Sequence, residues 1–307
     1  MCYNLFMKFL RKHKKATIIC SIVLVLLIVL VILMFTVFSL KEVEVELKTE
    51  TTNLTEEVVS EIKNETLKTG GSVLFLGKEK LISRLEKQFP YLKIVNIETQ
   101  IPNKLVIHAA EREEFFAVNS GEKSYFLDEK LKILRVENSI YSKQENGAVL
   151  LSFGSVFVDD EGRAYAEGID LQLDGAEAGQ TLSIGNSNEE EDYFSKKLET
   201  ISLSILTAFE ENGLQIQDVR SRFQSFEVFF KPVESVGLIS WQSCLKIVDS
   251  ANFEAQIVLA DSNLTEKIAT YNQAISAASK NPELLVNKVL YIFKNSGGEF
   301  AYSFLER

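Results

Sequence analysis

Cysteine and histidine are scarce in this chain of 307 residues. It has 3 cysteines and 2 histidines, and no CxxC or HExxH spacing groups any of them. Zinc sites and histidine-based catalytic triads need such side chains in clusters, and a disulfide framework needs several paired cysteines. The sequence therefore argues against a disulfide scaffold and a zinc enzyme, and we predict no metal and no cofactor.

Other signatures of chemistry are missing as well. The chain has no GxGxxG, Walker or GxSxG motif, so the sequence predicts no small-molecule substrate. Apolar residues make up 46% of the chain and charged residues 25%, with only 4 prolines. This is the composition of folded domains, and the length allows one to three of them.

The first 41 positions contain no acidic residue, and the segment from Ala16 to Leu40 contains no charge at all. As a helix, the apolar part of this segment spans about 31 Å, enough for a hydrocarbon core. Five basic residues precede it within the first 15 positions, which places the N-terminus in the cytoplasm by the positive-inside rule. A cleaved signal peptide is the alternative, but apolar signal cores are shorter.

Acidic residues dominate the rest of the chain. Beyond the basic tail there are 28 basic and 43 acidic residues. Such a surface repels nucleic acid, so we expect no nucleic-acid partner.

A small α+β unit is predicted directly after the apolar segment. Residues 42–48 alternate between apolar and charged side chains, as in a strand with one buried face. Polar residues at 53–57 offer helix N-caps, Gly70-Gly71 breaks the chain, and a second helix is predicted over 78–88 before Pro90. Two strands follow, the first with Val95, Ile97, Thr99 and Ile101 on one face, the second with Leu105, Ile107 and Ala109. The order is β-α-α-β-β, and His108 falls at a half-exposed strand position.

This region resembles the POTRA domain of the FtsQ/DivIB family of bacterial cell-division proteins. The resemblance lies in residues 71–76 (GSVLFL), in the hairpin 95–107 with its Ile101-Pro102-Asn103-Lys104 turn, and in the closing Glu111-Arg112 pair. That pair has two open readings, a solvated strand end or a contact. The family places this domain directly after a single membrane helix, as here.

The remaining residues predict a β-rich domain with two helices. Strands separated by acidic turns resemble the strand, Asp-x-x-Gly, strand elements of the family, although Lys130-Leu131 stands where a glycine is expected. Helices are predicted over about 192–212 and 265–279, and short strands over 226–230, 237–241, 255–259, 286–293 and 299–305. In 232–263 the sequence shows no clear counterpart of the Gly-containing hairpin that is usual in the family.

Two acidic clusters have ordinary explanations. Residues 189–192 (EEED) lack the Asp/Asn-Gly loop of a calcium site and are typical of a helix start. Asp159-Asp160-Glu161 could pair as acid and base, but a hairpin turn explains it equally well.

The last predicted strand places Phe300, Tyr302 and Phe304 on one face. An edge strand offers unpaired backbone groups to which a partner strand can add. These aromatics are our candidate partner-binding residues; the alternative is that they fill the core. The resemblance implies partner binding here, because in the family a single-pass partner adds a strand to the second domain.

The overall class is α+β. The predicted segments are a cytoplasmic tail (1–15), a transmembrane helix (16–40), a POTRA-like domain (41–112) and a β-rich extracytoplasmic domain (113–307). The resemblance implies a non-catalytic divisome scaffold in the bacterial cytoplasmic membrane that binds other single-pass division proteins at the septum. The alternatives are a membrane-anchored envelope enzyme and a POTRA module for envelope protein assembly.

Overall fold

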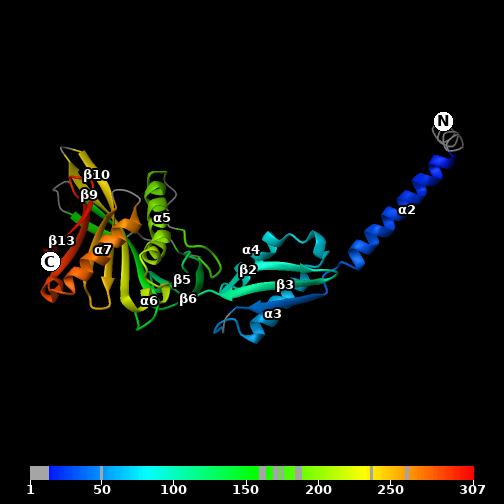
Figure 1. Ribbon diagram of the computed structural model, residues 1–307, viewed down its shortest axis with the longest axis horizontal. Coiled ribbons are helices and arrows are strands. Elements are labelled where there is room, and N and C mark those ends of the chain that lie inside the picture. The colour runs from blue at the N-terminus through cyan, green and yellow to red at the C-terminus, as the bar shows by residue number, and fades with distance from the viewer. Residues whose placement is uncertain are drawn as a thin grey trace. The chain divides into compact units, whose positions relative to one another are not determined.

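The structure is a computed structural model that describes residues 14–48, 51–158, 164–168, 173, 176–183, 189–235, 238–259 and 263–307. The chain divides into two compact units, Met1–Glu111 and Arg112–Arg307. Figure 1 shows the elements of both in chain order. We describe each unit by itself.

The first unit begins with the helix α2 (Lys14–Thr36). Its large apolar side chains from Ile18 to Phe35 are exposed wherever the structure describes them. Within the described ranges, no helix combines the length and hydropathy that crossing a membrane requires. The transmembrane helix predicted over 16–40 is thus not shown by the structure, and residues 1–13 of the predicted tail lie outside the described residues.

The rest of the first unit has the predicted β-α-α-β-β order, with a short 3₁₀ helix added. Its elements are β1 (Glu42–Leu47), α3 (Glu56–Lys68), η1 (Val73–Phe75), α4 (Lys78–Gln88), β2 (Leu92–Gln100) and β3 (Lys104–Glu111). The sheet order is β1-β3-β2, with β1 parallel and β2 antiparallel to β3. Ile62 of α3 and Leu85 of α4 share one core cluster with Leu105 and Ile107 of β3.

One face assignment in β2 is wrong. The pairing with β3 shifts between Ile94 and Asn96, which marks a β-bulge. Because a bulge inserts an extra residue, the alternation changes phase there. Ile94 and Ile97 are buried, whereas Val95 and Ile101, which we predicted on the same face as Ile97, are exposed.

The closing pair Glu111 and Arg112 makes contacts inside the chain. The Glu111 carboxylate accepts hydrogen bonds from the backbone N–H of Thr52 (2.7 Å) and of Asn53 (3.0 Å). Arg112 Nη1 lies 2.6 Å from Asp128 Oδ2, and both side chains are buried. The interpretation of the pair as a solvated strand end is therefore wrong for Arg112.

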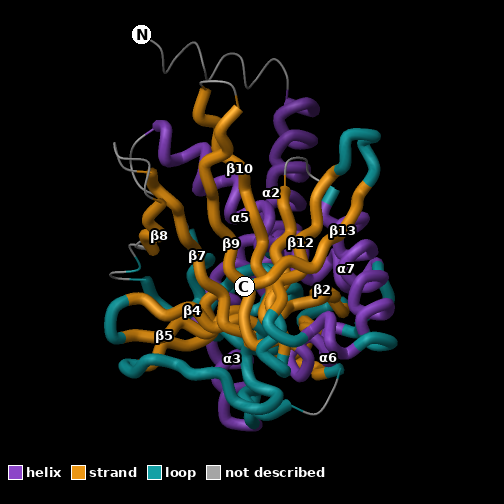
Figure 2. The backbone as a smooth tube through the Cα atoms, turned by 90° about the vertical axis from the view of Figure 1, so that its left-hand side faces the viewer, coloured by secondary structure: helices purple, strands orange, loops and turns teal. Residues whose placement is uncertain are grey.

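The second unit is built on one ten-stranded sheet. Its order is β13-β12-β11-β10-β9-β7-β4-β5-β6, with β8 paired to β7. Figure 2 shows β7, β9 and β10 next to one another, and β12 next to β13. The strands are β4 (Phe116–Ser120), β5 (Lys123–Leu127), β6 (Ile133–Glu137), β7 (Val149–Val158), β8 (Ala164–Gly168), β9 (Phe223–Ser235), β10 (Leu238–Asp249), β11 (Glu254–Leu259), β12 (Lys288–Lys294) and β13 (Phe300–Glu306).

The central hairpin is longer than predicted. β9 and β10 have 13 and 12 residues and pair antiparallel over most of their length. They run through much of 232–263, the segment in which the Gly-containing hairpin of the family was not recognised. Asp159-Asp160-Glu161, for which we predicted a turn, lies outside the described residues.

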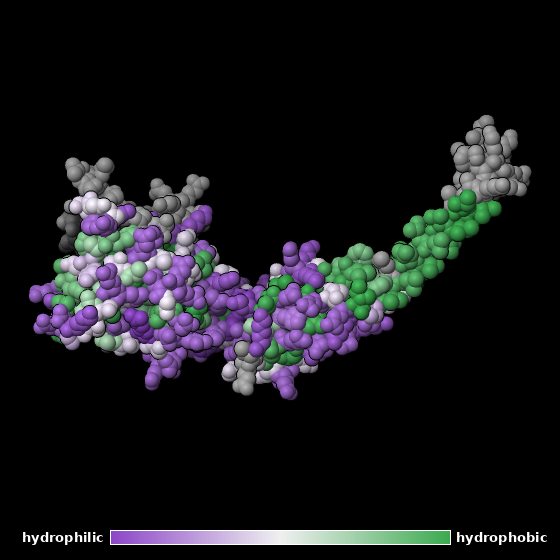
Figure 3. Space-filling view, in the orientation of Figure 1, coloured by the Kyte–Doolittle hydropathy of each residue, from purple (hydrophilic) through white to green (hydrophobic). Residues whose placement is uncertain are grey.

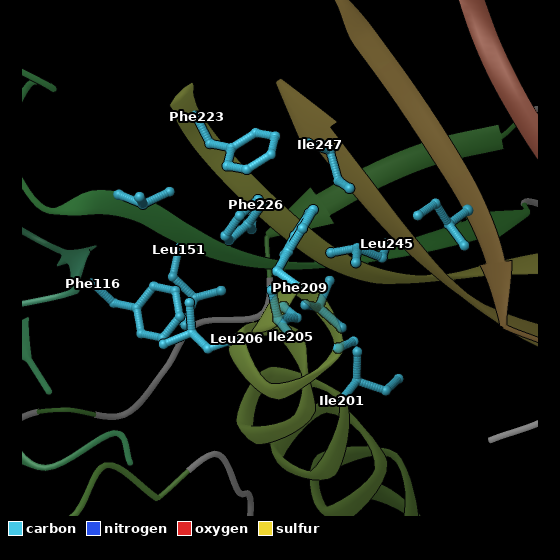
Figure 4. Packing of buried hydrophobic residues seen from close by; sticks show 14 of the residues in the cluster. Phe116, Leu151, Ile201, Ile205, Leu206, Phe209, Phe223, Phe226, Leu245 and Ile247 are labelled. Atoms are coloured by element: carbon cyan, nitrogen blue, oxygen red, sulfur yellow. The ribbon is translucent and has the colours of Figure 1, made fainter. Parts of the chain in front are cut away.

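The second unit has three helices in the described residues, one more than predicted: α5 (Glu189–Glu211), α6 (Ile216–Arg222) and α7 (Leu264–Ala278). A further 3₁₀ helix, η2 (Pro282–Leu285), precedes β12. Figure 4 shows Ile201, Ile205 and Phe209 of α5 directed toward aromatic and aliphatic side chains of the sheet. These side chains of α5 thus cover this face of the sheet.

The missing glycine at 130–131 is compensated by the aspartate before it. Leu131 has φ +60°, the left-handed region that favours glycine. Asp128 Oδ1 accepts hydrogen bonds from the N–H of Lys130 and Lys132, both at 2.8 Å, which holds the turn. The Leu131 side chain is buried in the core.

Candidate partner-binding edge

The candidate site is the strand β13, which lies at one end of the ten-stranded sheet. It pairs antiparallel with β12 in a register that runs from Lys288↔Glu306 to Lys294↔Phe300. In the described part of the chain no strand pairs with its other side. Its outer N–H and C=O groups are thus placed to accept a strand from another protein.

The three predicted aromatics share one face of β13. Tyr302 pairs with Ile292 and Phe304 with Leu290, and both partners are fully buried. Tyr302 and Phe304 pack against the core cluster under α7, and the Phe304 ring centroid lies 6.4 Å from that of Phe253. All three aromatics remain half-buried, so they border the core at the edge of the sheet.

A buried lysine supports this aromatic face. Lys267 of α7 is only 2% exposed, and its Nζ lies 5.4 Å from the centroid of the Phe300 ring. Lys294 Nζ lies 5.7 Å from the same ring. Cations at these distances are attracted by the face of an aromatic ring. Our sequence analysis missed Lys267, although it stands three residues after Leu264 and four before Tyr271, inside the apolar stripe.

The other face of β13 carries a second set of side chains that the sequence analysis did not select. Leu305 is 51% exposed, and the Ala301↔Phe293 pair places an exposed aromatic of β12 on the same face. The sequence could have shown this second set, because side chains in a strand alternate between its two faces. The odd-numbered residues of β13 therefore lie opposite the three aromatics.

Charged residues border this second face. Glu254 of β11 lies 3.3 Å from Arg307 Nη2 and 3.9 Å from Lys246 Nζ. Lys246 also lies 3.4 Å from Glu227 of β9. These contacts fix the C-terminal Arg307 beside β11, next to the edge strand.

Nearby, burial raises the pKa of the Cys244 thiol to about 11, so this cysteine is not an activated nucleophile.

The described residues hold no group of three or more His, Cys, Asp or Glu side chains suited to a metal ion. His108 of β3 is half-buried, as predicted, and its Nδ1 lies 2.9 Å from Glu46.

A hollow of about 370 Å³ in the second unit is lined by Asn212, Arg222 and Asn272, among others, and none of its lining residues is a carboxylate, cysteine or histidine. The α5 helix begins at Glu189, and the side chains of 189–192 lie outside the described residues.

Comparison with known proteins gives two results. A family model described as "POTRA domain, FtsQ-type" matches residues 38–112. The chain is 30% identical over 172 residues to "Cell division protein DivIB" of Clostridium acetobutylicum, which covers 55% of this chain and 57% of the relative. It is 28% identical over 120 residues to "Cell division protein DivIB" of Clostridium botulinum strain Loch Maree, covering 39% of this chain and 44% of the relative.

The matches thus span only about half the length of these relatives. The FtsQ-type description covers the unit formed by β1, α3, α4, β2 and β3 and the residues just before it. Together, the two comparisons confirm the resemblance of this chain to the FtsQ/DivIB family of cell-division proteins.

Proposed function

We propose that this protein is a non-catalytic cell-division scaffold, anchored in the cytoplasmic membrane, that binds other single-pass division proteins on the extracytoplasmic side of this membrane. The observation that carries the proposal is an FtsQ-type POTRA unit placed directly after a charge-free apolar segment. DivIB relatives, named as cell-division proteins, support a role at the septum.

The proposed anchor is the segment 16–40, which includes most of α2. It contains no charge, and its described large apolar side chains from Ile18 to Val37 are exposed, whereas Leu40 is buried in the core of the first unit. A helix that is apolar on every side needs either a protein core or lipid around it. Five basic residues at its N-terminal end support a cytoplasmic N-terminus.

Two reporter fusions test the anchor. Alkaline phosphatase fused after Arg307 should be active, because the enzyme folds only outside the cytoplasm, and a fluorescent protein at the N-terminus should collect at the septum. A C-terminal reporter that works only in the cytosol would rule out the scaffold as proposed.

The proposed binding site is the outer edge of β13, where a strand of a single-pass division protein adds. The aromatic face of Phe300, Tyr302 and Phe304 and the exposed Leu305 on the opposite face would contact alternate side chains of the added strand. Backbone hydrogen bonds would supply affinity and these side chains specificity.

Paired substitutions test this edge. Leu305 is 51% exposed on β13, and Ile140 is 56% exposed just after β6, at the opposite end of the sheet order. Leu305→Asp should reduce the recovery of single-pass division proteins with the purified full chain, and Ile140→Asp should not. Deletion of 299–307 should abolish recovery while the protein stays in the membrane. Equal recovery with all variants would disprove binding at this edge.

A further inference from the structure

The first unit exposes large apolar side chains at the end where the chain leaves α2. Phe75 of η1 is 71% exposed and Ile101, between β2 and β3, is 69% exposed. Leu74 is partly exposed beside Phe75, whereas Val73 in the same turn is buried. Single exposed apolar residues are common, but several that gather at one end of a domain mark a site of interaction with a protein or a membrane.

Backbone hydrogen bonds hold the Phe75 turn next to the end of α2. Leu40 N–H donates to Gly71 C=O (3.0 Å), Val73 N–H donates to Phe38 C=O (2.8 Å), and Ser39 and Ser72 form a bridge. Gly71 has φ +86°, which lets the chain turn into this bridge after α3.

The Ile101 turn is held at the same end by the register of the sheet. Asn103 C=O accepts hydrogen bonds from the N–H of Lys41 (2.9 Å) and of Glu42 (3.3 Å). β1 starts opposite the start of β3, with Glu42 paired to Lys104. The turn before β3 therefore lies beside the residues that follow α2.

The chain length between α2 and these contacts is short. Thr36 ends α2, and residues 38–41 follow within five positions. Extended chain covers at most about 3.5 Å per residue, so the first contact lies within about 7 Å of the helix end along the chain. The headgroup layer of a leaflet is about 5–8 Å deep. With α2 in the membrane, the Phe75 turn is held at the depth of this layer. Lys41, which bonds the Ile101 turn, follows Thr36 by five residues, at most about 18 Å of extended chain.

We propose that Leu74, Phe75 and Ile101 form a lipid-contacting tip that inserts into the interfacial layer of the bilayer beside α2. The inference rests on the proposed anchor and goes beyond it, because it assigns a second membrane contact to the folded domain. Leucine, isoleucine and phenylalanine are residues that enter this layer. In Figure 3 hydrophobic surface continues from α2 onto the neighbouring part of the first unit.

Lipid is favoured over a protein partner by continuity with the anchor. The tip is tied by backbone bonds to residues that follow α2 directly, so it reaches the bilayer surface without any other molecule. The exposed Val95 provides an internal contrast, because it lies in β2 six residues before Ile101, about 20 Å along an extended strand.

Tryptophan fluorescence of the full chain in vesicles tests the tip. The only native tryptophan is removed by Trp241→Phe, and Phe75→Trp, Ile101→Trp or Val95→Trp is added singly. The vesicles contain phosphatidylcholine and phosphatidylglycerol, with or without bromine on the upper acyl chain. Phe75→Trp and Ile101→Trp should show a blue shift and a loss of intensity with brominated lipid, and Val95→Trp should show neither. Circular dichroism confirms that each variant is folded.

Flotation after alkaline carbonate extraction tests the membrane anchor separately from the lipid-contacting tip. If the protein floats with the vesicles but position 75 and position 101 are quenched no more than position 95, the tip is refuted and the anchor stands. If the protein does not float, both fail. A photoreactive side chain at position 75 that captures a membrane protein in cells, without lipid quenching in vesicles, would also refute the lipid assignment.

Discussion

Arg112→Met is expected to destabilise the second unit strongly, because it leaves a buried carboxylate without its cation. Arg112 and Asp128 are 8% and 0% exposed and lie 2.6 Å apart. Removing one partner of a buried pair costs about 3–5 kcal/mol. The two backbone N–H groups that donate to Asp128 Oδ1 remain, so we expect the lower end, about 3 kcal/mol.

The matched control is the ion pair next to it. Arg220 Nη2 lies 2.7 Å from Glu113 Oε2, but these side chains are 25% and 49% exposed. The distances are nearly equal, and the difference is burial. Exposed pairs contribute about 0.2–1 kcal/mol, so Glu113→Gln should cost at most about 1 kcal/mol.

Urea unfolding of the full chain in detergent, followed by the fluorescence of Trp241 in β10, measures both costs in the second unit. With a slope of about 2–3 kcal/mol per M, the Arg112→Met midpoint should fall by about 1–1.5 M. The double variant Arg112→Met/Asp128→Asn should recover part of this loss, since the uncompensated charge is gone. A midpoint for Arg112→Met no lower than that of Glu113→Gln would refute the argument from burial.

Three further predictions concern the same unit. Phe209→Ala should cost about 3–5 kcal/mol by urea unfolding, because its fully buried ring packs 4.8 Å from that of Phe223. Leu131→Gly should still destabilise, by about 1–3 kcal/mol on the same assay, because the lost core side chain outweighs the relief at φ +60°. Cys244 should resist iodoacetamide at pH 8 in the folded chain and react in urea, as peptide mapping would show. Because burial raises its pKa from 9.0 to about 11, the unfolded thiol ionises first, and its contribution to stability should be lost as pH rises from 9 to 11.

Sequence patterns predicted most elements of the first unit and the helices α5 and α7. Each of these elements has one buried face, so apolar residues recur every two positions in a strand or every three to four in a helix. β2 is the exception, because a bulge is a property of pairing with β3 and leaves no mark on the alternation of β2 alone.

The second unit was predicted less well. β4 and α6 were missed, and β9 and β10 were taken as short strands. The central strands of a sheet are buried on their core face and half-buried on the other, so their alternation is weak, and a seven-residue helix shows too few turns for a clear stripe.

For the candidate site, the sequence alone determined that the last strand has an aromatic face and that residues 16–40 carry no charge, because both are local patterns. Only the tertiary structure decided that β13 lies at the sheet edge and that Lys267 is buried beneath Phe300. It also decided that the turns of Phe75 and Ile101 are both bonded to the residues that follow α2. Strand order and the pairing of distant segments depend on contacts between residues far apart in the chain, which local periodicity does not encode.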